Sequence, residues 1–173
     1  MKRCLVAIAI TSSVARAAPP GETPPIAPPP DGYLELALGA DSFAPAGLFG
    51  VVAFGAAIRW RDDLWLRGNL IGGPPLGDVK GGVVGGRIGI EHRTCATCAA
   101  GYYGVDLAVE RYDVNDDDDD EGGVALLAIA RAGVELGGAV KLRIGLELPL
   151  GLAVGPDVAT AGLDLHVGVI AQW

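Results

Sequence analysis

Residue types that usually carry chemistry are scarce in this chain of 173 residues. It has two histidines, three cysteines and one methionine, and beyond residue 17 its single serine is Ser42. Nucleophilic catalysis needs a serine or cysteine beside a base such as histidine, so few catalytic constellations can be built here. The scarcity argues against an enzyme. The formal net charge of -8 argues against nucleic acid as a partner.

Long apolar runs and helical patterns are also lacking. Half of the residues are hydrophobic and the mean hydropathy is +0.38. However, no stretch approaches the ~20 uninterrupted apolar residues of a transmembrane helix. No segment has a convincing amphipathic helical pattern, and 27 glycines disfavour a helical bundle. The apolar residues are dispersed along the chain, which excludes a membrane-spanning helix.

The first 31 residues divide into two segments of different composition. Residues 1–17 have a basic start (MKR), an apolar run (LVAIAI) and small residues at the end (ARA), which is typical of a cleaved secretory signal peptide. Residues 18–31, APPGETPPIAPPPD, are rich in proline and predict an extended periplasmic spacer. Residues 32–173 are then expected to form a single domain.

Eight segments with alternating apolar and polar residues follow the spacer. A period of two is typical of β-strands whose faces meet different environments. The segment lengths suit membrane-spanning strands of about 9 to 11 residues. The sequence therefore predicts an all-β fold, an eight-stranded antiparallel up-and-down transmembrane β-barrel. The expected strands are 33–40, 50–60, 64–71, 82–92, 102–112, 124–135, 140–150 and 163–173.

The connections and the aromatic residues support a barrel in a membrane. Short connections such as RDD alternate with longer ones such as DVNDDDDDEGG, which is typical of outer-membrane barrels. Aromatic residues gather at the strand ends, as expected for girdles at the level of the lipid headgroups. At the end that holds both termini they are Tyr33, Trp60, Trp65, Tyr102, Tyr103 and Trp173, and at the other end Phe43, Phe49 and Tyr112.

Charged residues within the strands are expected to face the interior of the barrel. Arginine or lysine on the lipid face near the bilayer centre costs about 2–4 kcal/mol. The interior of an eight-stranded barrel is just wide enough for side chains to fill, so near-balanced charges there predict a network of ion pairs. The expected interior set is Glu35, Arg59, Arg67, Arg87, Glu91, Asp106, Glu110, Arg131, Glu135, Lys141, Arg143, Glu147 and Asp164.

The last segment, LDLHVGVIAQW, ends on tryptophan after apolar residues at every second position. With the signal-like start, the eight alternating segments and the alternating connections, it resembles the small eight-stranded outer-membrane proteins of the OmpA transmembrane-domain and OmpX type. The resemblance implies that Leu165, Val167, Val169 and Trp173 are a recognition signal for the barrel-assembly machinery. It also implies a Gram-negative outer membrane with its lipid and lipopolysaccharide as surroundings, and we expect a monomer.

An acidic stretch between the fifth and sixth segments could attract a divalent cation. Asp116, Asp118 and Asp120 supply the hard oxygen ligands that calcium and magnesium prefer. An EF-hand that starts at Asp113 fails, because Asp118 takes the glycine position and Val124 the position of the bidentate glutamate. We therefore favour a solvated, self-repelling loop, and we expect no metal or other cofactor.

Cys95 and Cys98 form a C-x-x-C motif between the fourth and fifth segments. A thioredoxin-like role would need a helix start to lower the thiol pKa, and strands are expected on both sides. His92 adds a third soft ligand, but a zinc site normally needs four. The motif favours a structural disulfide in an oxidising compartment.

His166 is the residue for which a catalytic role has to be considered. Closure of a barrel would bring the last strand, with Asp164 and His166, beside the first strand and near Ser42. The competing interpretation, which we favour, is a hydrogen-bonded histidine within the interior network. The sequence thus predicts a barrel with a structural or surface-interaction role. The alternatives are a narrow channel for ions or small solutes, an enzyme that modifies outer-membrane lipid, and a soluble exported barrel with a small ligand.

Overall fold

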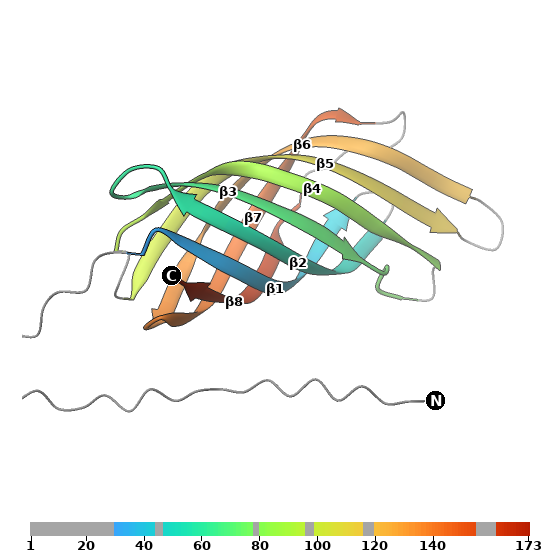
Figure 1. Ribbon diagram of the computed structural model, residues 1–173. Coiled ribbons are helices and arrows are strands. Elements are labelled where there is room, and N and C mark those ends of the chain that lie inside the picture. The colour runs from blue at the N-terminus through green and yellow to red at the C-terminus, as the bar shows by residue number, and fades with distance from the viewer. Residues whose placement is uncertain (1–29, 44–46, 78–79, 96–98, 116–119, 155–161) are drawn as a thin grey trace, which may run out of the picture.

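A computed structural model shows a closed barrel of eight antiparallel strands (Figure 1). Consecutive strands pair with one another, and β8 pairs with β1 to close the barrel. The strands are β1 (Gly32–Phe43), β2 (Gly47–Arg59), β3 (Leu64–Gly73), β4 (Lys80–Arg93), β5 (Ala100–Asn115), β6 (Asp120–Gly137), β7 (Val140–Val154) and β8 (Asp164–Gln172). The predicted eight-stranded up-and-down barrel is confirmed.

The structure describes residues 30–43, 47–77, 80–95, 99–115, 120–154 and 162–173. Within these ranges there is no helix of the length and apolarity needed to cross a membrane. The predicted signal peptide, residues 1–17, and nearly all of the predicted spacer lie outside the described residues.

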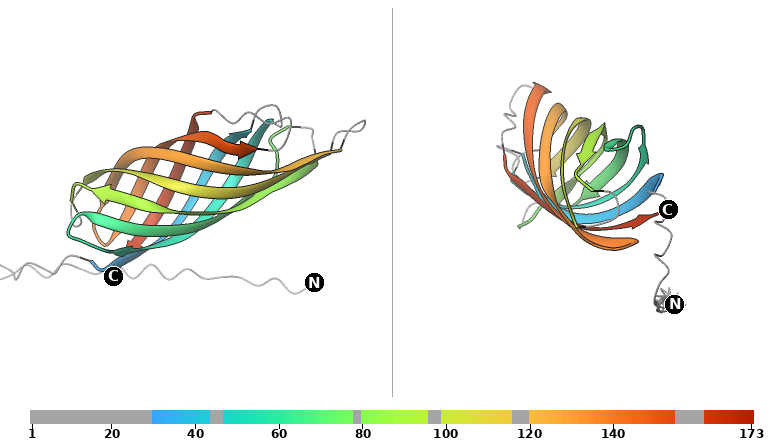
Figure 2. Two further views of the ribbon diagram at one scale, coloured as in Figure 1. Left: turned by 90° about the horizontal axis from the view of Figure 1, so that it is seen from above. Right: turned by 90° about the vertical axis from the view of Figure 1, so that its left-hand side faces the viewer.

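The start of β1 and the end of β8 lie together at one end of the barrel, which we call the termini end (Figures 1 and 2). There the backbone of Trp173 continues the β1–β8 ladder: its carbonyl accepts from Asp31 N at 2.9 Å, and its N–H donates to Gly32 O at 3.2 Å. The opposite end, called the far end, holds the β1–β2, β3–β4, β5–β6 and β7–β8 connections. The strands run obliquely between the two ends (Figure 2).

Seven of the eight strands extend further toward the far end than the sequence pattern predicts, whereas β8 begins at Asp164, one residue later than expected. The β5–β6 hairpin continues to the pair Asn115 and Asp120, so much of the expected acidic loop is strand. Arg111 and Asp113 are exposed on the outer face of this part of β5, so strand pairing there does not depend on apolar residues outside. A register shift between Leu126 and Leu127 on β6 accommodates one extra residue on β7, as in a β-bulge.

The two faces of the sheet differ sharply in chemistry. On β7, Leu142, Ile144 and Leu146 are exposed on the outside, while Lys141 and Arg143 are buried on the inside. A soluble protein would bury the leucines and expose the charges. An apolar exterior around a charged interior is the arrangement expected of a barrel that crosses a membrane.

Three of the aromatic rings expected in the girdle at the termini end face the interior instead. Tyr33 and Trp65 are 0% exposed and Tyr102 is 6% exposed. Position along a strand decides the level of a residue, but its parity decides its face. Tyr33 shares the inward parity of Glu35, and Trp65 that of Arg67, so the predicted outward placement of these rings is wrong.

The remaining aromatic residues divide between the two ends. Trp60, Tyr103 and Trp173 are more than half exposed on the outside at the termini end, where the expected girdle survives. At the far end Phe49 and Tyr112 are buried. The side chain of Phe43, the third ring expected there, lies outside the described residues.

Candidate functional site in the barrel interior

The interior charges form two clusters, one above the other along the barrel. All members are at most 8% exposed. The termini-end cluster consists of Glu35, Arg67, Glu91, Arg93, Asp106, Arg131, Glu135, Lys141 and Arg143. The far-end cluster consists of Asp41, Arg87, Glu110, Glu147, Asp164 and His166.

Glu135 and Glu91 each gather several cations in the termini-end cluster. Glu135 pairs with Arg93, with Arg143 at 2.5 Å and with the ammonium of Lys141 at 3.5 Å. Glu91 accepts from Arg131 and from Arg143, both at 2.7 Å. Because each carboxylate is shared, the loss of one would leave more than one buried cation without its counter-charge.

The other two carboxylates of this cluster extend the network toward the middle of the barrel. Arg67 bridges them, with Glu35 at 2.9 Å and Asp106 at 3.2 Å. Arg143 also reaches Glu35 at 3.2 Å, and Arg131 reaches Asp106 at 3.4 Å. Charges from β1, β3, β5, β6 and β7 are thus tied together across the interior.

Aromatic rings and guanidinium groups alternate through the termini-end cluster. The Arg93 guanidinium lies 4.8 Å from the centroid of the Trp65 ring and 5.1 Å from that of Tyr33. The Arg143 guanidinium lies 5.0 Å from Tyr33 and 4.2 Å from Tyr102. Cation–π contacts of this kind are stronger when desolvated. The stack fills the barrel at this end with side chains.

Two glycines make room for the last ring of this stack. Gly133 on β6 and Gly145 on β7 are register partners, and Tyr102 on β5 is the partner of Gly133. A Cβ at either glycine would collide with the Tyr102 hydroxyl. These glycines are therefore explained by the ring that lies across them.

Arg87 is the centre of the far-end cluster. Its Nε donates to Glu110 at 2.7 Å, its Nη1 to Glu147 at 2.5 Å and its Nη2 to Asp41 at 2.5 Å. Three carboxylates from β5, β7 and β1 thus converge on one guanidinium from β4. Charge-assisted hydrogen bonds of this geometry hold four strands in register from the inside.

His166 belongs to this cluster and not to a catalytic triad. Its Nε2 lies 2.9 Å from Asp41 Oδ1 and 3.3 Å from Glu147 Oε2. Ser42, the expected nucleophile, donates instead to Asp164, its hydroxyl at 3.0 Å and its backbone N–H at 2.9 Å. A triad needs the histidine on the hydroxyl, so the geometry supports the interpretation of an interior, hydrogen-bonded histidine.

Arg59 is the member of the expected interior set that lies elsewhere. It ends β2 at the termini end, where its guanidinium pairs with Asp31 at 2.6 Å while the Asp31 side chain is 83% exposed. Its place in the interior network is therefore corrected to the rim. Arg59 has the inward parity that was expected, but it is the last residue of β2 and therefore lies at the rim of the barrel.

Arg93 and Asp41 are two cluster members that the sequence analysis missed. Arg93 lies one residue beyond the expected fourth strand, and Asp41 lies in the expected first loop. Both continue the inward parity of residues that had been assigned, Glu91 and Glu35. Extension of each strand by a few residues would have found them.

The expected metal and disulfide residues fall partly outside the described structure. Asp116, Asp118 and Cys98 are outside the described residues, while Asp120 begins β6 and Cys95 is disulfide-bonded. Within the described ranges no group of three histidine, cysteine or acidic side chains could hold a metal ion. His92 does not turn to the cysteine motif, because it pairs with Asp63 at 2.6 Å and stacks on Tyr103.

The residues of the expected assembly signal share the outer face of β8. Leu165, Val167 and Val169 are 52%, 42% and 48% exposed, and Trp173 is 59% exposed. The Trp173 ring packs against the backbone of Gly32, where a Cβ would meet it. The four residues therefore form one continuous apolar strip that ends on an aromatic ring.

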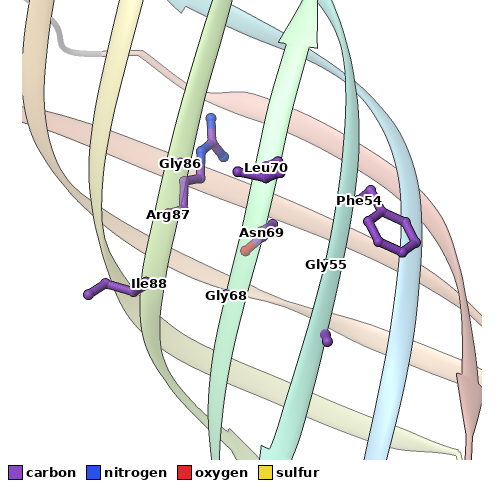
Figure 3. A pocket seen from close by; sticks show the side chains of 9 residues that line it. Phe54, Gly55, Gly68, Asn69, Leu70, Gly86, Arg87 and Ile88 are labelled. Carbon is purple, nitrogen blue, oxygen red and sulfur yellow. The ribbon is translucent and has the colours of Figure 1, made fainter.

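A shallow depression of about 390 Å³ lies on the outside of the barrel over β2, β3 and β4 (Figure 3). Phe54, Leu70 and Ile88 border it, and Gly68 and Gly86 leave it open because they carry no side chain. It is an apolar notch on the exposed face. The backbone of the sheet separates it from the clusters inside.

Comparison with known proteins places the fold among outer-membrane barrels. The sequence matches no protein-family model and resembles no curated protein. Among solved structures, Neisserial surface protein A has a TM-score of 0.63 and 14% identity over 82% of this chain and 96% of that one. The N-terminal β-barrel domain of Pseudomonas aeruginosa OprF has a TM-score of 0.60 and 14% identity over 84% of this chain and 100% of that one.

Ail, the attachment invasion locus protein of Yersinia pestis, is also similar, with a TM-score of 0.51 and 9% identity over 82% of this chain and 94% of that one. All three are small eight-stranded outer-membrane barrels. The expected resemblance to that class is confirmed at the level of the fold. Sequence identities this low support a shared fold and do not indicate a particular activity.

Proposed function

We propose that the protein is an integral outer-membrane barrel with a structural or surface-interaction role, and that its filled interior neither conducts nor catalyses. One observation carries the proposal: a band of exposed leucine, valine and isoleucine surrounds an interior of buried ion pairs. In water such an exterior would be an aggregation hazard, whereas lipid solvates it. The cation–π stack supports a closed interior.

The orientation and the partners follow from the same proposal. The signal peptide directs export, the termini end faces the periplasm, and the far end faces outward. Arg111 is exposed on the outer face near the far end of β5, where its side chain can reach the phosphates of outer-membrane lipid or lipopolysaccharide. Leu165, Val167, Val169 and Trp173 are the proposed signal for the barrel-assembly machinery, and the protein works as a monomer.

Fractionation combined with gel mobility tests the proposal. We expect the protein in the outer-membrane fraction after an alkaline wash. We also expect an unboiled sample in SDS to migrate differently from a boiled one, because the closed ladder of β1 with β8 resists the detergent. Recovery from the soluble periplasm, or a single mobility before and after boiling, would contradict a membrane barrel.

A narrow channel is the second candidate, and the excess of carboxylates in the far-end cluster favours it. Such a channel would select cations. Under the leading proposal we expect no unitary conductance in planar bilayers, since the stack of Trp65, Arg93, Tyr33, Arg143 and Tyr102 fills the termini end. A general-diffusion porin in the same bilayers is the positive control. Reproducible cation-selective steps would favour the channel.

A further inference from the structure

The two interior clusters are unequal in charge. In the termini-end cluster five cationic side chains meet four carboxylates. Among the described residues, the four carboxylates of the far-end cluster, Asp41, Glu110, Glu147 and Asp164, meet only Arg87 and His166. Buried charge is costly unless it is compensated. The far-end cluster therefore has more carboxylates than cationic side chains to balance them.

Unpaired hydrogen-bond acceptors in and beside this cluster also indicate a missing cation. Among the described residues, Glu110 is fully buried, yet only its Oε1 accepts from Arg87, and its Oε2 has no hydrogen-bond donor. Asn69 is 8% exposed and its carbonyl oxygen Oδ1 also has no donor. Asn69 on β3 is the register partner of Arg87 on β4, and Figure 3 shows the two side by side. The far-end cluster and the neighbouring Asn69 therefore have too few hydrogen-bond donors as well as too few cationic side chains.

The termini-end cluster has unpaired atoms of both kinds, mostly donors. Arg93 Nε and Nη1, and the indole Nε1 of the adjacent Trp65, are donors without an acceptor, and Asp106 Oδ1 is an acceptor without a donor. Around Glu110 and Asn69, by contrast, the unpaired atoms of the described residues are acceptors only. A general shortage of partners inside the barrel does not account for them.

The far-end cluster contains the two most exposed side chains of the interior ion pairs, while its Glu110 is fully buried. The side chains of His166 and Glu147 are 10% and 9% exposed, whereas those of Glu135 and Lys141 are 0% exposed. A solute from the far end would meet the buried apolar side chains of Phe49, Val83 and Tyr112 as well as the carboxylates, and the filled stack afterwards. The closed sheet bars entry from the lipid side.

We propose that the far-end cluster binds a small organic cation with N–H donors, a primary ammonium compound, from the solution outside the cell. The Glu110 carboxylate supplies the counter-charge, and the Asn69 carbonyl accepts a second hydrogen bond. An ammonium group fits better than a metal ion, because it carries three donors that can serve separate acceptors. In the described part of the chain, no group of three or more histidine, cysteine or acidic side chains could hold a metal ion. The outward direction of the far end rests on the proposed function.

Titration calorimetry on the folded full chain in detergent micelles tests the site. The probes are methylammonium chloride and tetramethylammonium chloride, which carry the same charge but differ in having N–H donors. We expect methylammonium to bind, and tetramethylammonium to bind at least about tenfold more weakly, since hydrogen bonds to charged groups account for a factor of that size.

Variants locate the site within the chain. Glu110→Gln is expected to weaken methylammonium binding at least about tenfold, and Asn69→Ala to weaken it less. Asp113→Asn is the matched control, because Asp113 is an exposed acidic residue on the same strand, and it should bind like the parent. Arg87 keeps Asp41 and Glu147 in the Glu110 variant, and the gel-mobility shift verifies that each variant folds.

Three outcomes would overturn the inference. They are no methylammonium binding by the folded parent, equal binding of both ammonium probes, and unchanged binding by folded Glu110→Gln. If Glu110→Gln does not fold, unchanged binding by Asn69→Ala decides against the site. Failure of the proposed function is separate, since it would appear as loss from the outer-membrane fraction while binding in micelles is unaffected.

Discussion

Replacement of Glu135 by glutamine is expected to lower the free energy of unfolding by about 3–5 kcal/mol, the usual effect of removing one partner of a buried ion pair. Glu135 is fully buried and pairs with Arg93, Lys141 and Arg143. The amide is nearly the same size as the carboxylate, so little of the loss would come from packing. The loss of stability comes from the buried cations that are left without a counter-charge.

Urea titration of the barrel in lipid vesicles, followed by tryptophan fluorescence, measures this change. Asp31→Asn is the matched control, because it also removes a carboxylate from an arginine pair, but at a side chain that is 83% exposed. It should change stability by about 0–1 kcal/mol. Equal effects of the two variants would show that the interior carboxylates do not hold the barrel together.

Replacement of Leu107 by arginine should cost about 2–4 kcal/mol in the same assay. Leu107 is 52% exposed on the outer face in the middle of β5, the level at which the bilayer centre is expected. The cost comes from placing a guanidinium in hydrocarbon. In a soluble barrel the same change would put a charge into water and cost little.

Leu136→Arg provides the comparison that isolates depth. Leu136 is also about half exposed on the outer face, but it lies next to the end of β6. There the side chain can reach the headgroups, and the expected cost falls to about 0–1 kcal/mol. If both arginines cost the same, the outer face is not embedded in a bilayer as proposed.

The sequence predicted the fold because one rule acts at every strand. A charge cannot face lipid, so alternating patterns reveal both the strands and their inner faces. The segment VKLRIGLELPL shows this, since Lys141, Arg143 and Glu147 are inside and the leucines between them are outside. Strand ends were predicted less well, because a charged side chain is not confined to the inner face where it can reach water.

The organisation of the interior could be predicted only in part. Parity placed Arg87, Glu110 and Glu147 inside, but three strands have to be brought into register before these residues meet. Register between strands is set by turns and bulges, and a bulge such as that opposite Leu126 is not visible in the pattern. The division into two clusters of unequal charge therefore emerged only from the structure.

The pairing of β1 with β8 has a consequence for how the barrel forms. Tyr33 is the register partner of Gln172, so this edge of β1 stays unpaired until β8 has been synthesised. Until then β1 presents an unpaired edge of backbone groups and an apolar face to its surroundings. Contacts this distant in sequence make folding slow. Escort by a chaperone that masks the open edge would therefore protect the chain from aggregation before closure.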